Sequence, residues 1–279
     1  EPVRFVYELV KDWPDRPLLM YDMAHVLGLY GAFQAPFEEG ADIVTGSTHK
    51  TFFGSQRGLI AGNIAQDSPW PQLWTDIQTR AFPGSTSNHH LGTLLGLLLA
   101  TYEMNEFKEA YQTQVRKNAK ALARFLKETG IPVEGDETDG FTETHQVLIR
   151  VKQFGNGQEL ARRLEDNNII TNYQALPDDT TFLESSGLRL GVQEMTRFGM
   201  KEKDFEILAG LIAEVIRKNK PVRDEAKRYR QNFLEMQYCL PEKEAVELAS
   251  NLFLSLFPAR GVGQKLVENL ASKIKEEGN

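Results

Sequence analysis

The sequence predicts an α/β protein with part of a large domain, built on a mostly parallel sheet, and a smaller C-terminal α+β domain. Short apolar runs alternate with amphipathic segments at the start, a long amphipathic segment follows, and strand and helix patterns then resume. The 279 residues, 41% hydrophobic and 25% charged, suffice for a sizeable core. We expect residues 1–110 to be the C-terminal part of the large domain, 111–240 the small domain and 241–279 a helical extension.

Composition excludes several classes of protein. The formal net charge is −7 and the basic residues are dispersed, which argues against a nucleic-acid partner. No apolar run approaches the roughly 20 residues of a membrane span, so we expect no membrane association. The single cysteine, Cys239, cannot form an internal disulfide, which favours a reducing compartment. A cytoplasmic location is therefore expected.

Two short strands are predicted in the first domain, each followed by polar residues. The apolar run at residues 17–21 ends at Asp22, and the run at residues 41–45 ends just before a polar cluster at residues 47–50. In an open parallel sheet, ligands bind outside the carboxyl ends of the strands. Both sets of polar residues therefore fall on the predicted functional edge.

A long amphipathic helix is predicted from Glu103, where apolar residues recur at three- and four-residue steps as far as Phe125. Gly130 follows as a C-terminal stop. The elements expected next are a strand at 145–151, a helix at 157–167, a strand at 168–171, a helix at 203–218, a solvated charged helix face at 221–230 and a helix at 242–257.

Three residues at these strand ends and loops match the chemistry of a pyridoxal phosphate enzyme. The amine of Lys50 can form a Schiff base with the cofactor aldehyde. The carboxylate of Asp22 can keep the pyridine nitrogen protonated, and the guanidinium of Arg189 can bind an amino-acid carboxylate through two hydrogen bonds. Taken singly, these residue types are more often a helix cap, a solvated lysine and a surface ion pair, and their order and placement at strand ends favour the functional interpretation.

Longer segments around these residues carry a resemblance to a known family. They include an Asp-x-Ala-His motif at residues 22–25, a His-Lys-Thr motif at 49–51, and residues 41–45 and 186–191. Phe-Pro-Gly at 82–84 and Thr-Arg-Phe-Gly at 196–199 also have counterparts, in register. Over about residues 12–240 the chain resembles serine hydroxymethyltransferase, a family of fold-type I pyridoxal phosphate enzymes.

The resemblance implies a role for each site residue. Lys50 would be the Schiff-base lysine, Asp22 the partner of the pyridinium and His25 a neighbour of the phenolic oxygen of the cofactor. The implied catalytic residues are Lys50, His49 and Asp22, the cofactor-binding residues are Asp22, His25, Ser47, Thr48, His49, Lys50 and Arg57, and the substrate-binding residue is Arg189. Arg57 stands one residue further from Lys50 than the family pattern has it. For His25 and His49, a purely structural, hydrogen-bonded histidine is the alternative.

Two departures from the family pattern concern the phosphate and the one-carbon carrier. Residues 85–90 replace a Gln-Gly-Gly-Pro run that in the family reaches the cofactor phosphate of a neighbouring subunit. Residues 178–184 replace a Ser-Pro-Phe segment associated with folate, which makes tetrahydrofolate the weaker of the two cofactor predictions. The adjacent His89 and His90 would point to opposite sides of an extended chain, so no metal site is predicted.

The position of Lys50 in the chain leads to an expectation about partners. In fold-type I enzymes the lysine lies near the middle of the subunit, and the loop that binds the phosphate precedes it. Phosphate needs several converging donors, and no such loop can be assigned here. We therefore expect this chain to be the C-terminal portion of the enzyme, and a companion N-terminal chain or fragment to supply the rest. The Glu1-Pro2 start, without an initiator Met, fits this expectation.

The sequence thus predicts a pyridoxal phosphate-dependent hydroxymethyltransferase or aldolase-type enzyme. Its substrate would be a small amino acid: glycine, serine, threonine or an α-substituted analogue. The alternatives are an aminotransferase, racemase or decarboxylase, or a non-catalytic partner subunit of such an enzyme, because one fold carries many reactions. A homo-oligomer of the complete unit is expected.

Overall fold

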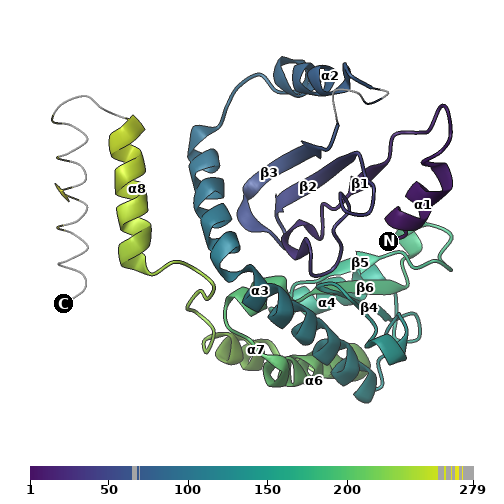
Figure 1. The fold of residues 1–279 in the computed structure, drawn as a ribbon. Coiled ribbons are helices and arrows are strands. Elements are labelled where there is room, and N and C mark those ends of the chain that lie inside the picture. The colour runs from purple at the N-terminus through teal and green to yellow at the C-terminus, as the bar shows by residue number, and fades with distance from the viewer. Residues whose placement is uncertain are drawn as a thin grey trace. The chain divides into compact units, whose positions relative to one another are not determined.

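The computed structural model describes residues 1–64, 68, 70–256 and the single positions 261, 265, 268, 269 and 272 (Figure 1). Contacts divide the chain into two compact units, Glu1–Tyr238 and Cys239–Asn279. In the second unit the structure describes helix α8 (Glu242–Leu256), and residue 257, where the sequence places its end, lies outside the described residues. The division predicted at residues 110 and 240 remains a prediction.

The first unit holds two three-stranded sheets. The elements before and around the first sheet are α1 (Val3–Val10), β1 (Met20–Asp22), η1 (Leu27–Leu29), β2 (Ile43–His49), β3 (Phe53–Gly62), α2 (Leu73–Thr79), η2 (Arg80–Ser85) and α3 (Leu91–Glu128). Those of the second sheet and its helices are η3 (Glu137–Asp139), β4 (Gln146–Arg150), α4 (Gly157–Asp166), β5 (Asn172–Gln174), η4 (Phe182–Glu184), β6 (Gly187–Gly191), α5 (Gln193–Arg197), α6 (Glu202–Lys218) and α7 (Arg223–Arg230).

The first sheet has the order β1-β2-β3 and is mixed. β1 pairs with β2 in parallel, with Asp22 opposite Thr45, whereas β2 and β3 form an antiparallel pair. The sequence prediction ended the second strand at residue 45 and did not include β3, which contains glycines at 54, 58 and 62. Ser47, Thr48 and His49 therefore lie inside β2, where pairing with β3 holds them.

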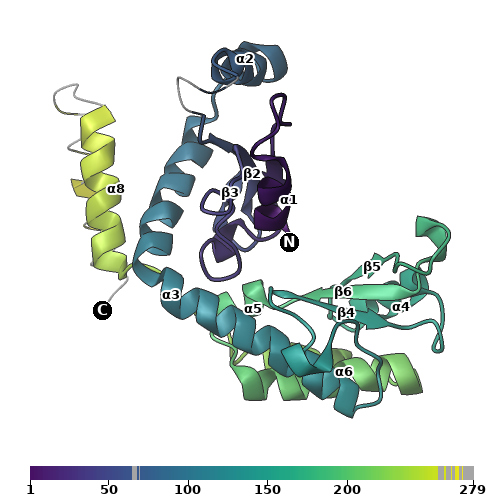
Figure 2. The same cartoon turned by 45° about the vertical axis from the view of Figure 1, so that its right-hand side comes forward.

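Helix α3 connects the two sheets (Figure 2). It begins at Leu91, twelve residues before the predicted start, and ends where predicted, since Gly130 follows with a φ of 84° that a left-handed C-terminal turn requires. Tyr111 and Val115, near its middle, are almost completely buried, and its later turns pack on α6. The helix therefore fixes the first sheet relative to the second.

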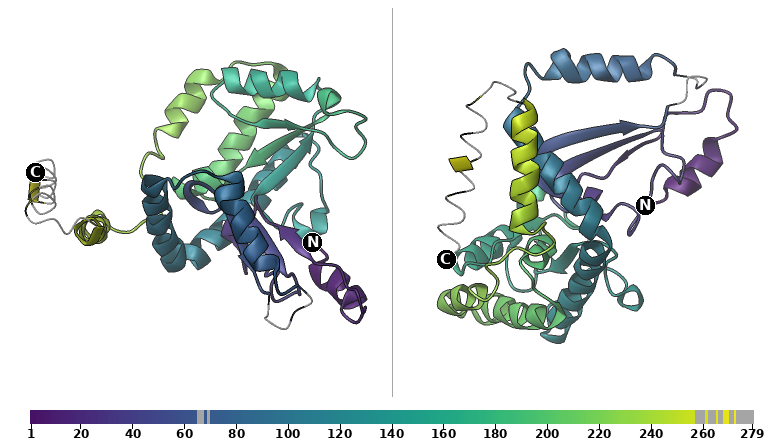
Figure 3. Two further views of the ribbon diagram at one scale, coloured as in Figure 1. Left: turned by 90° about the horizontal axis from the view of Figure 1, so that it is seen from above. Right: turned by 60° about the vertical axis from the view of Figure 1, so that its left-hand side comes forward.

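The second sheet has the order β4-β6-β5, and both pairs are antiparallel. Its strands are labelled in Figure 2, and Figure 3 shows the same ribbon from two further sides. The strand predicted at 168–171 is wrong: Asn168 has a φ of 63° and forms part of a turn, so that the strand begins only at Asn172. α4 begins at an Asn156 side chain that accepts a hydrogen bond from the backbone of Gln158, and it ends one residue before its predicted end. The predicted α+β character of this region is confirmed.

A buried ion pair joins elements of both halves of the first unit. The guanidinium of Arg197, on α5, lies 2.7 Å from the carboxylate of Glu103 on α3, and both side chains are about nine-tenths buried. The same guanidinium stacks on the ring of Phe53, 3.5 Å from its centre, at the start of β3. These contacts hold the Lys50 turn, just before β3, close to the second sheet.

Among the described residues, no helix is long and apolar enough to cross a membrane.

Candidate active site

The carboxyl ends of β1 and β2 bring Asp22 and the Lys50 turn to the same edge of the first sheet, as the parallel pairing requires. Asp22 is exposed, and its Oδ1 accepts a hydrogen bond of 2.9 Å from the backbone of Ala24. Lys50 is half-buried in the turn that follows β2. Within the part of the chain that the structure describes, no hydrogen bond or ion pair occupies the Lys50 ammonium. The amine is therefore available to a ligand.

Thr51 ties the Lys50 turn to the loop after β1. Its hydroxyl donates to the carbonyl oxygen of His25 at 2.8 Å and accepts from the backbone of Gly28 at 3.0 Å. A Cβ on Gly28 would lie 2.2 Å from the Thr51 backbone, so only glycine permits this approach. On the other side, the hydroxyl of buried Tyr111 donates to the Thr51 carbonyl oxygen at 3.0 Å. The segments that carry Lys50 and His25 thus have a fixed relative position.

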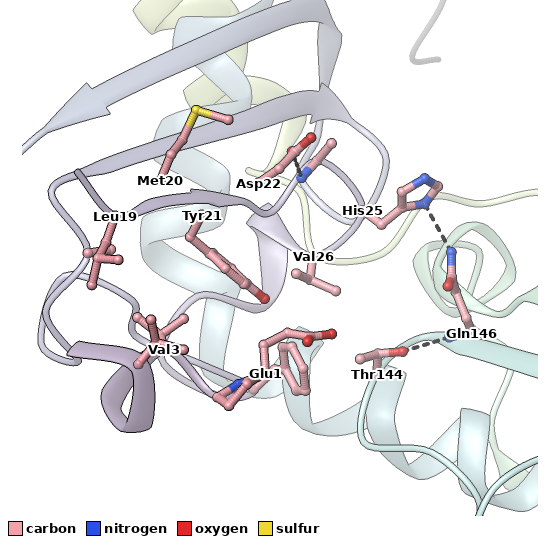
Figure 4. A pocket seen from close by; sticks show the side chains of 15 residues that line it. Glu1, Val3, Leu19, Met20, Tyr21, Asp22, His25, Val26, Thr144 and Gln146 are labelled. Carbon is pink, nitrogen blue, oxygen red and sulfur yellow. Dashed lines mark hydrogen bonds between the residues drawn. The ribbon is translucent and has the colours of Figure 1, made fainter. Parts of the chain in front are cut away.

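His25 lies among the charged residues of the site. Burial lowers the pKa of His25, the cations of Lys50 and Arg189 lower it further, and the carboxylate of Asp22 acts in the opposite direction. Asp22 and His25 come from the end of β1 and the loop after it, Lys50 from the turn after β2 and Arg189 from the middle of β6, so residues from three separate segments act on this ring. The His25 ring also contacts Gln146, at the start of β4 (Figure 4).

His145 packs against His25 from the second half of the unit. The two rings are stacked, with centroids 6.3 Å apart, and His145 is only 2% exposed. Burial, followed by His25, Arg189 and Lys50, lowers the pKa of His145 to about 3. Its Nδ1 has no hydrogen-bond partner in the described residues. His145 is therefore neutral wherever the protein is folded near neutral pH.

We predict that His145 makes stability depend on acidity. Its pKa is about 3 in the folded protein and ordinary, near 6.5, in the unfolded chain, so between these values only the unfolded state binds the proton. The free energy of unfolding should therefore fall as pH is lowered from 6.5 towards 3, by up to about 1.4 kcal/mol per pH unit. Urea unfolding at several pH values measures this effect. As pH is lowered, the free energy of unfolding should fall less in His145→Phe than in the parent protein.

The matched control for that experiment is exposed His89. His89→Phe removes an imidazole that lies at the surface, and should leave the pH dependence of unfolding as it is in the parent protein. An unchanged pH dependence in His145→Phe would contradict the prediction.

Arg189 lies in the middle of the second sheet, on β6. It stands opposite Leu148 on β4 and opposite Asn172 on β5, so it shares a sheet face with Gln146, two residues before Leu148. The opposite face carries buried Leu188 and Leu190. Among the described residues, no hydrogen bond or ion pair occupies the Arg189 guanidinium. A free guanidinium on the face nearer His25 can bind a carboxylate.

Two of the predicted site residues have other contacts. The Thr48 hydroxyl, at the irregular pairing between β2 and β3, lies 2.7 Å from the carbonyl oxygen of Ser55 and 3.1 Å from that of Arg57. The Arg57 guanidinium donates to Thr93 and to the carbonyl oxygen of His90, at the start of α3. These bonds hold β3 and α3 rather than extend towards Lys50. Ser47 is half-buried and His49 exposed, beside the Lys50 turn.

The segment that departs from the folate pattern is a closed turn. The Asp179 carboxylate accepts hydrogen bonds of 2.8 Å from the backbones of Leu176 and Ser186. Asp178 forms an ion pair of 2.8 Å with Arg150. These residues fix the chain just before β6 and therefore the position of Arg189.

Sequence reasoning missed the contributions of Gln146, His145, Thr51 and Tyr111. The sequence predicts a strand at residues 145–151, but this prediction gives no role to the two polar residues with which the strand opens, His145 and Gln146. The available signal was their place: two hydrogen-bonding side chains open a strand that is otherwise mostly apolar. Thr51 and Tyr111 carry no such signal, because their contacts depend on segments 60 residues apart.

The fold and the candidate site together indicate a class of protein. A lysine and a carboxylate lie at the carboxyl ends of parallel strands, with a histidine in the loop after the first strand and an arginine on a second sheet. This arrangement, in an α/β fold, defines the class of fold-type I pyridoxal phosphate-dependent proteins.

The particular family follows from comparison with known proteins. Residues 9–212 match the profile of the family described as "Serine hydroxymethyltransferase", and the chain belongs to this family. It is 44% identical over 252 residues to serine hydroxymethyltransferase of Archaeoglobus fulgidus, covering 88% of this chain and 55% of that protein. It is 42% identical over 260 residues to serine hydroxymethyltransferase of Pyrobaculum calidifontis, covering 91% and 58%.

A solved structure also has a fold similar to that of this chain. The chain superposes on L-threonine transaldolase from Pseudomonas fluorescens in the internal aldimine state with a TM-score of 0.74 and 38% identity, covering 84% of this chain and 54% of that one. The predicted family and fold class are thereby confirmed, and the predicted pyridoxal phosphate cofactor is confirmed for the family. The chain spans about half the length of the curated relatives that it matches.

Proposed function

We propose that this chain carries the lysine and the substrate-binding arginine of a pyridoxal phosphate enzyme that makes or breaks the bond between the α and β carbons of a small amino acid. The observation that carries the proposal is the placement of the site residues. Asp22 and the Lys50 turn lie at one sheet edge, where Thr51 bonds to His25, and His25 bonds to Gln146, which shares a sheet face with Arg189. The names of the similar proteins, hydroxymethyltransferases and a threonine transaldolase, support this reaction type over others. Glycine, serine, threonine or an α-substituted analogue would be the substrate.

The residues present fit the cofactor. An amine without a partner among the described residues, an exposed carboxylate and a half-buried histidine are the three kinds of group that bind a pyridine aldehyde at its aldehyde carbon, its ring nitrogen and its phenolic oxygen. When bound, the protonated pyridine ring accepts the electron pair left on the α carbon when a substrate bond breaks. Lys50, Asp22 and His25 would hold the cofactor, with Ser47 and His49 beside the lysine.

Each of these site residues then has a separate role. Lys50 would hold the cofactor aldehyde through its amine, which has to leave this position for the amino group of the substrate to bind there. Arg189 binds the substrate carboxylate through two parallel hydrogen bonds, which orients the bond to be broken. Asp22 keeps a proton on the ring nitrogen by its negative charge. Thr48 and Arg57 would act indirectly, by holding β3 next to the Lys50 turn.

We further propose that the complete enzyme includes a companion N-terminal chain or fragment and is a homo-oligomer. Support comes from the relatives, of which the chain spans 55% and 58%, and from the scarcity of phosphate donors near Lys50. Among the described residues, Thr48 and Arg57 are already bonded to neighbouring elements. Tetrahydrofolate as the one-carbon carrier and a cytoplasmic location remain predictions.

Product identity tests the proposed reaction. The complete enzyme containing this chain, incubated with glycine and an aldehyde, should form a β-hydroxy-α-amino acid, and the reverse reaction should release the aldehyde. Incubation of an amino acid with a keto acid should give no amino-group exchange at a comparable rate. Rapid transamination without aldol product would contradict the proposal and favour an aminotransferase, and absence of the cofactor from the intact assembly would favour a non-catalytic subunit.

A further inference from the structure

A hydrogen bond connects the two halves of the first unit at His25. Gln146 Nε2 lies 2.9 Å from His25 Nδ1, between residues 121 positions apart in the chain (Figure 4). Gln146 is the first residue of β4, and its backbone donates to the hydroxyl of Thr144 at 3.2 Å. The second sheet, which carries Arg189, therefore contacts the side chain of His25 directly.

The chemistry of the amide determines the state of the histidine. The Gln146 amide is oriented with Nε2 towards the ring, and a carboxamide nitrogen donates hydrogen bonds, so in this orientation Nδ1 of His25 is the acceptor. A neutral imidazole that accepts at Nδ1 carries its proton on Nε2. Burial and the cations of Lys50 and Arg189 lower the pKa of His25, which favours this neutral ring.

Four groups face His25 from the elements packed around it. They are Asp22 at the end of β1, Lys50 in the turn after β2, Arg189 on β6 and His145 in the segment before β4. Among them, Asp22 alone favours the protonated ring. Gln146 is the one neutral side chain that bonds to Nδ1 among the described residues, so it decides which nitrogen carries the proton.

We propose that Gln146 is a positioning residue that holds His25 as the neutral Nε2–H tautomer and fixes the direction in which this proton points. The Nε2–H donor, which has no partner among the described residues, then lies on the side of the ring away from Gln146, where an acceptor on the cofactor or substrate can bind it. Because the same sheet carries Arg189, Gln146 also sets the position of His25 relative to the substrate carboxylate. This role in catalysis rests on the proposed function, whereas the tautomer itself does not.

Nitrogen-15 NMR of the histidine side chains tests the tautomer without an activity measurement. The chain has five histidines, so the signal of His25 can be assigned by its loss in His25→Asn. The complete enzyme should show His25 with an unprotonated Nδ1 and a protonated Nε2. In Gln146→Leu, which removes the donor, this preference should be lost. Gln146→Asn keeps the amide on a shorter side chain and should lose the preference as well. This second variant tests the proposal if Gln146→Leu folds poorly.

Gln146→Glu separates positioning from packing, because it keeps the size of the side chain and replaces the donor by an acceptor. The carboxylate should draw the proton to Nδ1 and raise the pKa of His25. The acid limb of the pH profile of kcat/KM should then move to higher pH, by about one unit or more. In Gln146→Leu, kcat should fall roughly 10- to 100-fold, while KM for the amino acid stays near its usual value, because Arg189 is unchanged.

The matched control is Gln153→Glu, the same substitution at an exposed position outside the site, which should change neither the tautomer nor the pH profile. A protonated Nδ1 in the parent enzyme, or an unchanged tautomer and pH profile in both Gln146→Leu and Gln146→Glu, would overturn the proposal. If the tautomer changes as expected but the enzyme shows no aldol chemistry, the positioning contact stands and the proposed function fails.

Discussion

Lys50→Ala should abolish the reaction of the complete enzyme. Removing the amine that holds the cofactor should lower turnover by a factor on the order of 10³ or more, as expected when a nucleophile is lost. The absorbance band of the lysine-bound cofactor should disappear as well. The variant should still fold, because the Lys50 ammonium has no protein partner among the described residues and the side chain is only half-buried.

The control for this substitution is Lys108→Ala on helix α3. Lys108 is exposed and lies outside the site, so its removal should leave both turnover and absorbance unchanged. Circular dichroism of both variants should match that of the parent enzyme. Activity retained in Lys50→Ala would show that another residue binds the cofactor.

Arg189→Lys should chiefly weaken binding of the amino acid. Lysine keeps the positive charge but lacks the planar fork that forms two parallel hydrogen bonds with a carboxylate. Loss of such a charge-assisted contact should raise KM roughly 10- to 100-fold. Steady-state kinetics with the amino acid as varied substrate measures this effect, and the absorbance of the bound cofactor should remain as in the parent enzyme.

Arg162→Lys on helix α4 is the matched control. Arg162 is exposed and distant in sequence from every site residue, so KM should be unaffected. An unchanged KM in Arg189→Lys would contradict the assignment of Arg189 to the substrate carboxylate. A loss of cofactor absorbance in that variant would instead place Arg189 at the cofactor.

Local patterns in the sequence were sufficient to predict the class of fold and the sheet edge where the candidate site lies, although β2 continues four residues beyond its predicted end. Apolar runs that end at Asp22 and shortly before Lys50 identify the edge of the sheet, because parallel strands end together. The stop of α3 was also predictable, since Gly130 adopts a conformation that favours glycine. These features depend only on neighbouring residues.

Contacts between distant segments could not be predicted in this way. Strand β3 contains several glycines and exposed residues, and it becomes a strand through its pairing with β2. The bond between Gln146 and His25, like the attachment of Thr51 to Gly28 and Tyr111, joins residues that only the tertiary fold brings together. The residues that hold the site in place were missed for this reason. The roles of Lys50, Asp22 and Arg189, which were inferred from the chemistry of their side chains, stay predictions.

Chemical trapping of the bound cofactor tests the central claim most directly. Borohydride reduction of the complete enzyme should fix pyridoxal phosphate to a single lysine, and peptide mass mapping should find the added pyridoxyl mass on the peptide that contains Lys50. A label on another lysine, or no label at all on enzyme isolated with its partner chains, would contradict the account.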